Sequence, residues 1–248
     1  MLNEETFQKL AAMKIHGFAA AFHEFLDQKV PDKLTFEERI GLMVDREWTG
    51  RQERRLKARL QLAKLRFPAC MEDIDYRHPR GLDRSVMQRL GSMRWVAEKE
   101  NIIISGKTGL GKTWLACAIG DKACREDLYV RYFRLPRLLE SLRIGKGDGT
   151  YEKTLNLIAK TTVIILDDFG LATFQDGGRR DLLEILEDRY GRASTIVASQ
   201  VPVREWHGAL GDPTVADAIL DRLIHNAHPI DLKGPSIRKP KGRNGSKE

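Results

Sequence analysis

Cysteine is scarce in this chain, which has 248 residues and only Cys70, Cys117 and Cys124. Three cysteines at irregular spacing form neither a disulfide framework nor a CxxC zinc site, so we expect reduced thiols in a cytoplasmic protein. No apolar run approaches the roughly 20 residues of a membrane-spanning helix. Because Glu4 and Glu5 stand where a signal peptide would carry positive charge, we expect neither export nor a membrane partner.

Metal-ligand and hydrolase patterns are also missing. The six histidines have no spacing typical of a metal site, and no Ser-His-Asp arrangement can be inferred from one sequence. The chain shows no base-reading DNA motif and no internal repeat. Apolar residues nevertheless make up 42% of the chain and charged residues 31%, a balance typical of a globular protein.

Positive charge is in excess, with 42 Lys and Arg against 35 Asp and Glu. Between residues 46 and 66 there are eight basic residues and only two acidic ones. The excess indicates a polyanionic partner, although such a charge also simply aids solubility. Non-specific DNA binding requires Lys and Arg that neutralise backbone phosphates, without base readout. The candidate DNA contacts in this basic cluster are Arg51, Arg54, Arg55, Lys57 and Arg59.

The pattern over residues 1–66 predicts a small all-helical N-terminal domain. Thr35 and Glu38 match the capping-box pattern, which predicts the start of a long helix. Apolar residues in this helix repeat at four-residue intervals, and we expect them to form a buried seam, with Trp48 in the core. The seam residues are Phe36, Ile40, Val44 and Trp48.

The remainder of the chain predicts a second domain. Pro68, Pro79 and Gly81 mark residues 67–83 as a linker, so we expect a domain over 84–233 and a disordered basic tail over 234–248. Short apolar runs alternate with helical patterns, which predicts an α/β fold with a mainly parallel five-stranded sheet between helices. The expected strands are 101–105, 129–133, 162–166, 195–199 and 229–232, and the expected helices are 84–97, 114–125, 135–143, 179–190 and 215–224.

The segment GKTGLGKT matches G-x-x-x-x-G-K-[ST], the phosphate-loop pattern. It lies between an expected strand and an expected helix, where backbone N–H groups and the helix N-terminus can hold phosphates. We expect Lys112 to contact the β- and γ-phosphates of ATP and the Thr113 hydroxyl to bind Mg²⁺. The predicted ATP-binding residues are Gly106, Lys107, Thr108, Gly109, Leu110, Gly111, Lys112 and Thr113.

A second motif, VIILDD, is an apolar strand that ends in two carboxylates. This is a Walker B pattern, in which we expect Asp167 to hold Mg²⁺ and Asp168 to orient and deprotonate the attacking water. Paired acids at a strand end are often only solvated, but their position after a phosphate loop favours catalysis. Asp168 has a shorter reach than the commoner Glu, so we expect slow ATP hydrolysis.

Two further polar residues are candidates for the reaction. Gln200 follows the expected strand 195–199 and can lie between the attacking water and the γ-phosphate; the alternative is an ordinary loop glutamine. Arg222 near the end of helix 215–224 can stabilise transition-state charge in a neighbouring subunit's site. Its alternative role is a surface salt bridge with Asp221 or Asp217.

The combination of GKTGLGKT, VIILDDFG, ASQVP and ILDRL with the N-terminal stretches LAAMKIHGFAAAF, LTFEERIGLMVDREWTGRQERR and DIDYRHPRGLDR resembles the IstB-like transposition helper ATPases. These are AAA+ proteins related to DnaC and DnaA. The resemblance implies an ATP-dependent homo-oligomer that binds double-stranded DNA non-specifically and recruits or stimulates an integrase-type transposase. In that scheme Gln200 is sensor 1, and Arg222 is the arginine finger for the neighbouring subunit.

Some features of this resemblance leave alternatives open. We expect no C-terminal helical lid after the last strand, and Arg238 from the tail is a candidate substitute for a lid-borne sensor. The basic cluster can bind the transposase instead of DNA. Two other roles remain: a helicase loader of the DnaC type, and an adaptor for which ATP is only an assembly switch.

Overall fold

The computed structural model describes residues 2–27 and 34–237. The chain divides into two compact units, residues 1–58 and 59–248. The division lies inside a helix, earlier in the chain than the linker 67–83 expected from the sequence. Arg238 and the tail residues that follow it lie outside the described residues. Within the described residues, no helix is both long and apolar enough to cross a membrane.

The N-terminal unit is built from helices, as expected. These are α1 (Leu2–Ala12), α2 (His16–Leu26) and α3 (Phe36–Ala63), whose last turn belongs to the second unit. The capping box is present, because the Thr35 N–H donates to Glu38 Oε2 at 2.7 Å and the Glu38 N–H donates to Thr35 Oγ1 at 3.2 Å. These two bonds satisfy N–H groups that the first helical turn leaves unpaired, so α3 begins where the sequence predicted.

The apolar seam expected along α3 is wrong. Phe36 is 73% exposed and Trp48 63% exposed, and Ile40 and Val44 are exposed as well. In the part of α3 that belongs to the N-terminal unit, the buried positions are Met43 and Glu47, which are four residues apart on another face of the helix. The four-residue period was real, but it could not indicate which face of α3 is covered.

Glu47 joins α3 to the first turn of α2. Its Oε2 accepts the backbone N–H of Gly17 at 2.7 Å and that of Phe18 at 3.3 Å, so a carboxylate from α3 caps the positive end of α2. Its Oε1 accepts Arg51 Nε at 2.6 Å. The Arg51 guanidinium, together with these two amides, holds the pKa of Glu47 below its usual value.

This cap predicts that the packing of α2 on α3 weakens in acid. Because the folded pKa of Glu47 is lowered, its stabilisation is complete above the unfolded pKa of about 4.3 and is lost as the pH falls through the folded value. We expect amide hydrogen exchange in α2 to rise over that pH range more than the intrinsic exchange rate predicts. Glu47→Gln should raise exchange already at pH 7 and remove the extra pH dependence, whereas Glu53→Gln, on the exposed part of α3, should not. An α2 that exchanges alike in wild type and Glu47→Gln would contradict the cap.

The second unit contains the predicted sheet. Its strands are β1 (Asn101–Gly106), β2 (Val130–Arg134), β3 (Val163–Phe169), β4 (Ser194–Ser199) and β5 (Ala227–Leu232). They pair in the order β2-β3-β4-β1-β5, and every neighbouring pair is parallel. Three of the five strands, β1, β3 and β4, carry continuous apolar runs that are buried on both faces of the sheet. Because their pairing is parallel, the carboxyl ends of these three strands meet at one edge of the sheet.

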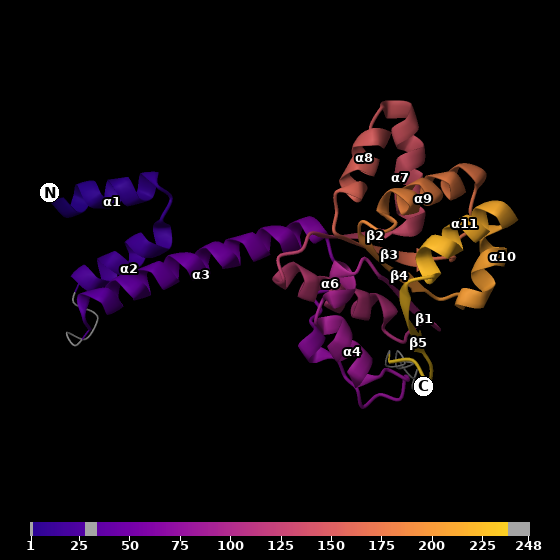
Figure 1. The fold of residues 1–248 in the computed structure, drawn as a ribbon, viewed down its shortest axis with the longest axis horizontal. Coiled ribbons are helices and arrows are strands. Elements are labelled where there is room, and N and C mark those ends of the chain that lie inside the picture. The colour runs from indigo at the N-terminus through magenta and orange to yellow at the C-terminus, as the bar shows by residue number, and fades with distance from the viewer. Residues whose placement is uncertain (1, 28–33, 238–248) are drawn as a thin grey trace, which may run out of the picture. The chain divides into compact units, whose positions relative to one another are not determined.

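Helices cover both faces of this sheet (Figure 1). One face is covered by α6 (Lys112–Arg125), with α4 (Arg84–Gly91) and α5 (Arg94–Ala97) nearby. The other carries α7 (Leu135–Asp148), α8 (Tyr151–Ala159), α9 (Asp176–Arg189), α10 (Trp206–Leu210) and α11 (Pro213–Ile224). Two short 3₁₀ turns, Met71–Asp73 and Val203–Glu205, complete the elements. Among the residues described after β5, none is helical.

The helix predictions were incomplete on both faces of the sheet. The expected helix 84–97 is two helices, because Met93 adopts a left-handed φ of 58° that breaks the helical hydrogen-bond series. Helices α8 and α10 were not predicted. The spacing of Tyr151, Leu155 and Ile158 is helical, and Leu155 and Ile158 pack in the core, so the signal for α8 was present in a short segment.

Arg189, at the end of α9, forms hydrogen bonds near the starts of the two central strands β3 and β4. Its side chain is buried, and its guanidinium donates to the carbonyls of Ile158 and Thr161 at 2.7 Å each and to that of Ser194 at 2.5 Å. Burial lowers the pKa of Arg189 to about 10. These bonds connect α8, the approach to β3 and the start of β4. The strand β3 carries Asp167 and Asp168 near its carboxyl end, and β4 ends at Ser199.

Candidate nucleotide site

The phosphate-loop motif forms the turn between β1 and α6. Gly106 has φ 142°, and a Cβ atom there would lie 2.4 Å from the Leu232 carbonyl oxygen on β5. Gly111, at φ 83°, precedes the first turn of α6. No side chain larger than hydrogen fits at Gly106 without moving β5. Gly106 thus lets the backbone pass close to β5, and Gly111 lets the loop turn into the first turn of α6.

Eight of the predicted site residues line one pocket of about 560 Å³ beside this turn: Thr108, Gly109, Gly111, Lys112, Thr113, Asp167, Asp168 and Gln200. Leu110 is fully buried, and Gly106 and Lys107 border a separate hollow near β5. Lys107 nevertheless contributes its carbonyl, which accepts Lys112 Nζ at 2.9 Å. Three strand ends, β1, β3 and β4, therefore bring the separate motifs together.

Thr113 and Asp167 form the part of the pocket that suits a metal ion. Thr113 Oγ1 donates to the buried Asp167 carboxylate at 2.9–3.0 Å, so a hydroxyl and a carboxylate lie side by side. Such oxygen ligands fit Mg²⁺, which usually takes one or two protein ligands and completes its shell with water and phosphate oxygens. These two residues would hold the ion predicted from the sequence.

Two residues that the sequence did not indicate also contact Asp167. Tyr132 on β2 donates its hydroxyl to Asp167 Oδ2 at 2.6 Å, and Arg66 lies 3.6 Å from the same oxygen. Burial, reinforced by Asp167, raises the pKa of Tyr132 above its usual value, so the phenol stays a hydrogen-bond donor. Tyr132 lies on the adjacent strand and Arg66 lies in the segment before β1. No local sequence motif connects either residue to the Walker B aspartates.

Asp168 is held in a strained conformation by an arginine. Its φ is 62°, in the left-handed region, and the β3–β4 register shifts between Leu166 and Phe169. Arg134, the last residue of β2, donates to Asp168 Oδ2 from Nε at 2.9 Å and approaches it from Nη2 at 2.8 Å. Unusual backbone geometry is concentrated at functional sites. Here the register shift accompanies a change of direction between two consecutive acids: Asp167 contacts Thr113 and Tyr132, whereas Asp168 contacts Arg134.

Gln200 and Arg222 occupy very different places. Gln200 follows β4, and its Oε1 accepts the Thr108 hydroxyl of the phosphate loop. Arg222 on α11 pairs with Glu187 at 2.9 Å, and its carbonyl accepts Asn101 Nδ2 at 3.0 Å. Asn101 begins β1, at the edge of the sheet opposite the phosphate loop. Gln200 thus belongs to the pocket, whereas Arg222 lies away from the phosphate loop of its own chain and pairs with neither Asp217 nor Asp221.

The five candidate DNA-contacting residues differ in exposure and in whether a carboxylate of the same chain pairs with them. Arg51 and Arg54 both pair with Glu47. Arg55 and Lys57 are exposed. Arg59 belongs to the second unit and is largely covered: it donates to the Cys124 carbonyl at 3.0 Å and pairs with Asp127. Arg55 and Lys57 are therefore the most accessible cations of the five.

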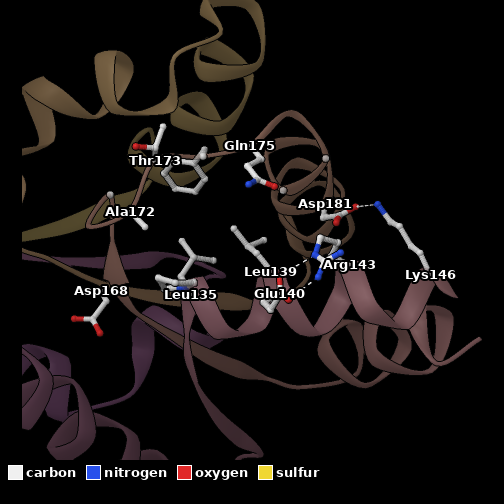
Figure 2. Close-up of a pocket in the computed structure, with 15 residues that line it drawn as sticks. Leu135, Leu139, Glu140, Arg143, Lys146, Asp168, Ala172, Thr173, Gln175 and Asp181 are labelled. Atoms are coloured by element: carbon white, nitrogen blue, oxygen red, sulfur yellow. Dashed lines mark hydrogen bonds and ion pairs between the residues drawn. The ribbon is translucent and has the colours of Figure 1, made fainter. Parts of the chain in front are cut away.

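A second cavity of about 340 Å³ lies between α7, α9 and the loop after β3. Figure 2 shows Asp168 at its edge, with the carboxylate turned away from the side chains of α7 and α9. The charged groups of this cavity are paired, since Lys146 lies 2.5 Å from Asp181 and Arg143 lies 2.7 Å from Glu140. Because these charges neutralise each other, the cavity does not resemble a phosphate site.

The sheet is parallel and has the order β2-β3-β4-β1-β5. A phosphate loop follows β1, and two carboxylates lie near the end of β3. Together these features define a P-loop protein with an AAA+ core. The solved structure of the DnaC helicase loader has this fold: it superposes with a TM-score of 0.56 at 21% identity and covers 69% of this chain and 100% of that one.

Sequence comparison assigns the family. The family model of the IstB-like ATP binding protein matches residues 8–245. An insertion sequence ATP-binding protein of Sinorhizobium fredii is 49% identical over 243 residues, which cover 98% of this chain and 99% of the relative. One from Pseudomonas fluorescens is 43% identical and covers 82% of this chain and 88% of the relative. The chain belongs to the IstB-like ATP binding protein family.

Proposed function

We propose that this protein binds ATP with Mg²⁺, hydrolyses it, and uses it to assemble on DNA as the partner of a transposase. The observation that carries the proposal is the meeting of phosphate loop and Walker B residues in one pocket, with Thr113 bonded to Asp167. Relatives named as insertion sequence ATP-binding proteins support the transposition context.

The pocket residues divide the work of hydrolysis. Lys112 and the amides of the loop bind the β- and γ-phosphates, and a bound Mg²⁺ neutralises charge that develops on them. Asp168 accepts a proton from the attacking water, which Gln200 orients from the end of β4. Thr113 and Asp167 hold the ion. Because Arg222 lies away from its own phosphate loop, its proposed role as arginine finger requires a neighbouring subunit in a homo-oligomer.

The DNA-binding part of the proposal rests on charge. Arg55 and Lys57 are exposed cations on a helix that also carries Arg51 and Arg54, and such cations bind backbone phosphates without reading sequence. Assembly on double-stranded DNA would bring subunits side by side. ATP binding would then be coupled to the assembly that an integrase-type transposase recognises.

The test is ATP-dependent assembly on duplex DNA. We expect the wild-type protein with a non-hydrolysable ATP analogue and Mg²⁺ to form large complexes in gel shifts and sizing runs, and to stimulate an integrase-type transposase. Lys112→Ala should abolish the assembly because it removes a phosphate contact. The double variant Arg55→Gln, Lys57→Gln should keep nucleotide binding and weaken DNA binding.

Three results would overturn parts of the proposal. Identical sizing profiles with and without nucleotide would exclude ATP-dependent assembly. Capture of a replicative helicase in place of the transposase would favour a helicase loader. Full transposition by a variant that binds but does not hydrolyse ATP would identify ATP as an assembly switch only.

A further inference from the structure

Arg80 is a buried cation beside the phosphate loop that has no role in the motifs described above. Only 3% of its surface is exposed. Nη1 donates to the Leu110 carbonyl at 3.1 Å, and Nη2 donates to the Asp75 carbonyl at 3.3 Å. Its own carbonyl accepts the Lys233 N–H at 2.9 Å. Arg80 thereby joins the linker, the phosphate loop and the segment after β5.

The charge of Arg80 has no partner of opposite sign within contact. Both of its hydrogen-bond acceptors are neutral carbonyls, and none of the described carboxylates forms an ion pair with it. Its Nε is buried and has no hydrogen-bond partner. Burial lowers the pKa of Arg80 more than the nearby Asp75 carboxylate raises it, in keeping with the cost of a desolvated charge. A native protein rarely keeps such a group without a reason, and an anionic ligand would supply one.

The other arginines of the same pocket are arranged differently. Arg66 faces Asp167 and Arg134 is paired with Asp168, so carboxylates already balance their charges. Arg80 also lines the pocket, yet its guanidinium hydrogen bonds go only to backbone carbonyls. Among the three arginines described in the pocket, it is the one whose positive charge is left to act on a ligand.

The position of Arg80 along the phosphate loop indicates which part of a ligand it would reach. A Cβ atom on Gly111 would lie 2.9 Å from Arg80 Nη1 and 3.4 Å from Ile237 Cδ1, so Arg80 approaches the loop at Leu110 and Gly111. Asp167, which we expect to hold Mg²⁺, instead contacts the end of the phosphate loop at Thr113. Arg80 is therefore separated from the Mg²⁺ end of the site.

We propose that Arg80 is a further nucleotide-binding residue, which contacts the phosphates shared by ADP and ATP. This inference rests on the proposed function, because it requires that the pocket bind a nucleotide. Arg80 complements Lys112: one cation serves the phosphates near Gly111, and the other serves the β- and γ-phosphates beside the metal. A guanidinium buried in this way binds an anion strongly, since water does not compete for it.

The test compares nucleotides with and without phosphates in the full chain. Fluorescent N-methylanthraniloyl derivatives of ADP, of a non-hydrolysable ATP and of adenosine are titrated into wild type, Arg80→Gln and Arg80→Lys. We expect Arg80→Gln to weaken ADP and ATP binding by the same factor, about 10- to 100-fold for one charge-assisted hydrogen bond, and to leave adenosine binding unchanged. Arg80→Lys should give an intermediate loss, because it keeps the charge without the planar fork. If Arg80→Gln does not fold, Arg80→Lys alone is compared with wild type.

Arg77→Gln is the matched control. Arg77 lies in the same segment, its side chain is 95% exposed, and it pairs with Asp75, so its loss should not change nucleotide affinity. Unchanged ADP affinity in both Arg80 variants would overturn the inference, as would an equal loss for adenosine, which would show that Arg80 only shapes the pocket. If wild type binds none of the nucleotides, the proposed function fails instead.

Discussion

Asp168→Asn is expected to lower the turnover number for ATP hydrolysis by about 100- to 10,000-fold, the usual contribution of a positioned proton acceptor, while ATP still binds. The amide keeps the size of the carboxylate and can still accept a hydrogen bond from Arg134, which contacts Asp168 at 2.8–2.9 Å. Lys112 and Thr113, which we expect to hold phosphates and Mg²⁺, are untouched. Phosphate release and the affinity for a fluorescent ATP analogue measure the two quantities separately.

Asp188→Asn provides the control for this substitution. Asp188 lies on the exposed surface of α9, and the same change of charge there should leave turnover at the wild-type level. If Asp168→Asn hydrolyses ATP as fast as wild type, another group accepts the proton. If it loses nucleotide affinity along with turnover, Asp168 acts in binding, and the division of roles between Asp167 and Asp168 is wrong.

Arg189→Met is expected to destabilise the second unit by about 3 to 5 kcal/mol, because three buried carbonyls lose their donor and each unsatisfied group costs about 1–3 kcal/mol. The carbonyls are those of Ile158, Thr161 and Ser194. A loss of this size approaches the whole stability of many domains, which is about 5–15 kcal/mol. The urea midpoint of unfolding, followed by circular dichroism, measures the effect.

Arg192→Met tests whether the effect comes from these bonds. Arg192 is an exposed arginine in the turn that follows α9, so its replacement should change the free energy of unfolding by less than about 0.5 kcal/mol. An unchanged urea midpoint in Arg189→Met would mean that the three carbonyls find other donors. In that case Arg189 would not connect β3 with β4.

The sheet and the main pocket could be predicted because their signals are local. The apolar, β-branched runs of β1, β3 and β4 are typical of strands buried on both faces, and the glycines of GKTGLGKT require a tight turn between a strand and a helix. Parallel strands then bring their carboxyl ends to one edge, so Asp167, Asp168 and Gln200 were expected near Lys112. The pocket residues confirm that arrangement.

Other contacts could not be predicted because they depend on pairs far apart in the chain. Arg66, Tyr132 and Arg134 reach the two aspartates only through the neighbouring strand and the linker, and no spacing rule connects them. The prediction of a core position for Trp48 is wrong, because a four-residue period marks a face of a helix without indicating what covers that face. Arg80 is a similar case, since its burial results from packing against Leu110 and Asp75.

The pairing of β1 with β5 also bears on how the site forms during synthesis. Ser105 and Asp231, which share a hydrogen bond across these strands, are 126 residues apart, and Gly106 lies against Leu232. Contacts between such distant segments form slowly, because closing the long loop between them costs chain entropy before the contact stabilises it. While a ribosome is still adding α11, the phosphate loop lacks the strand on one of its sides. We infer that a nascent chain gains nucleotide affinity only after β5 has emerged, so the loop matures late although its residues are made early.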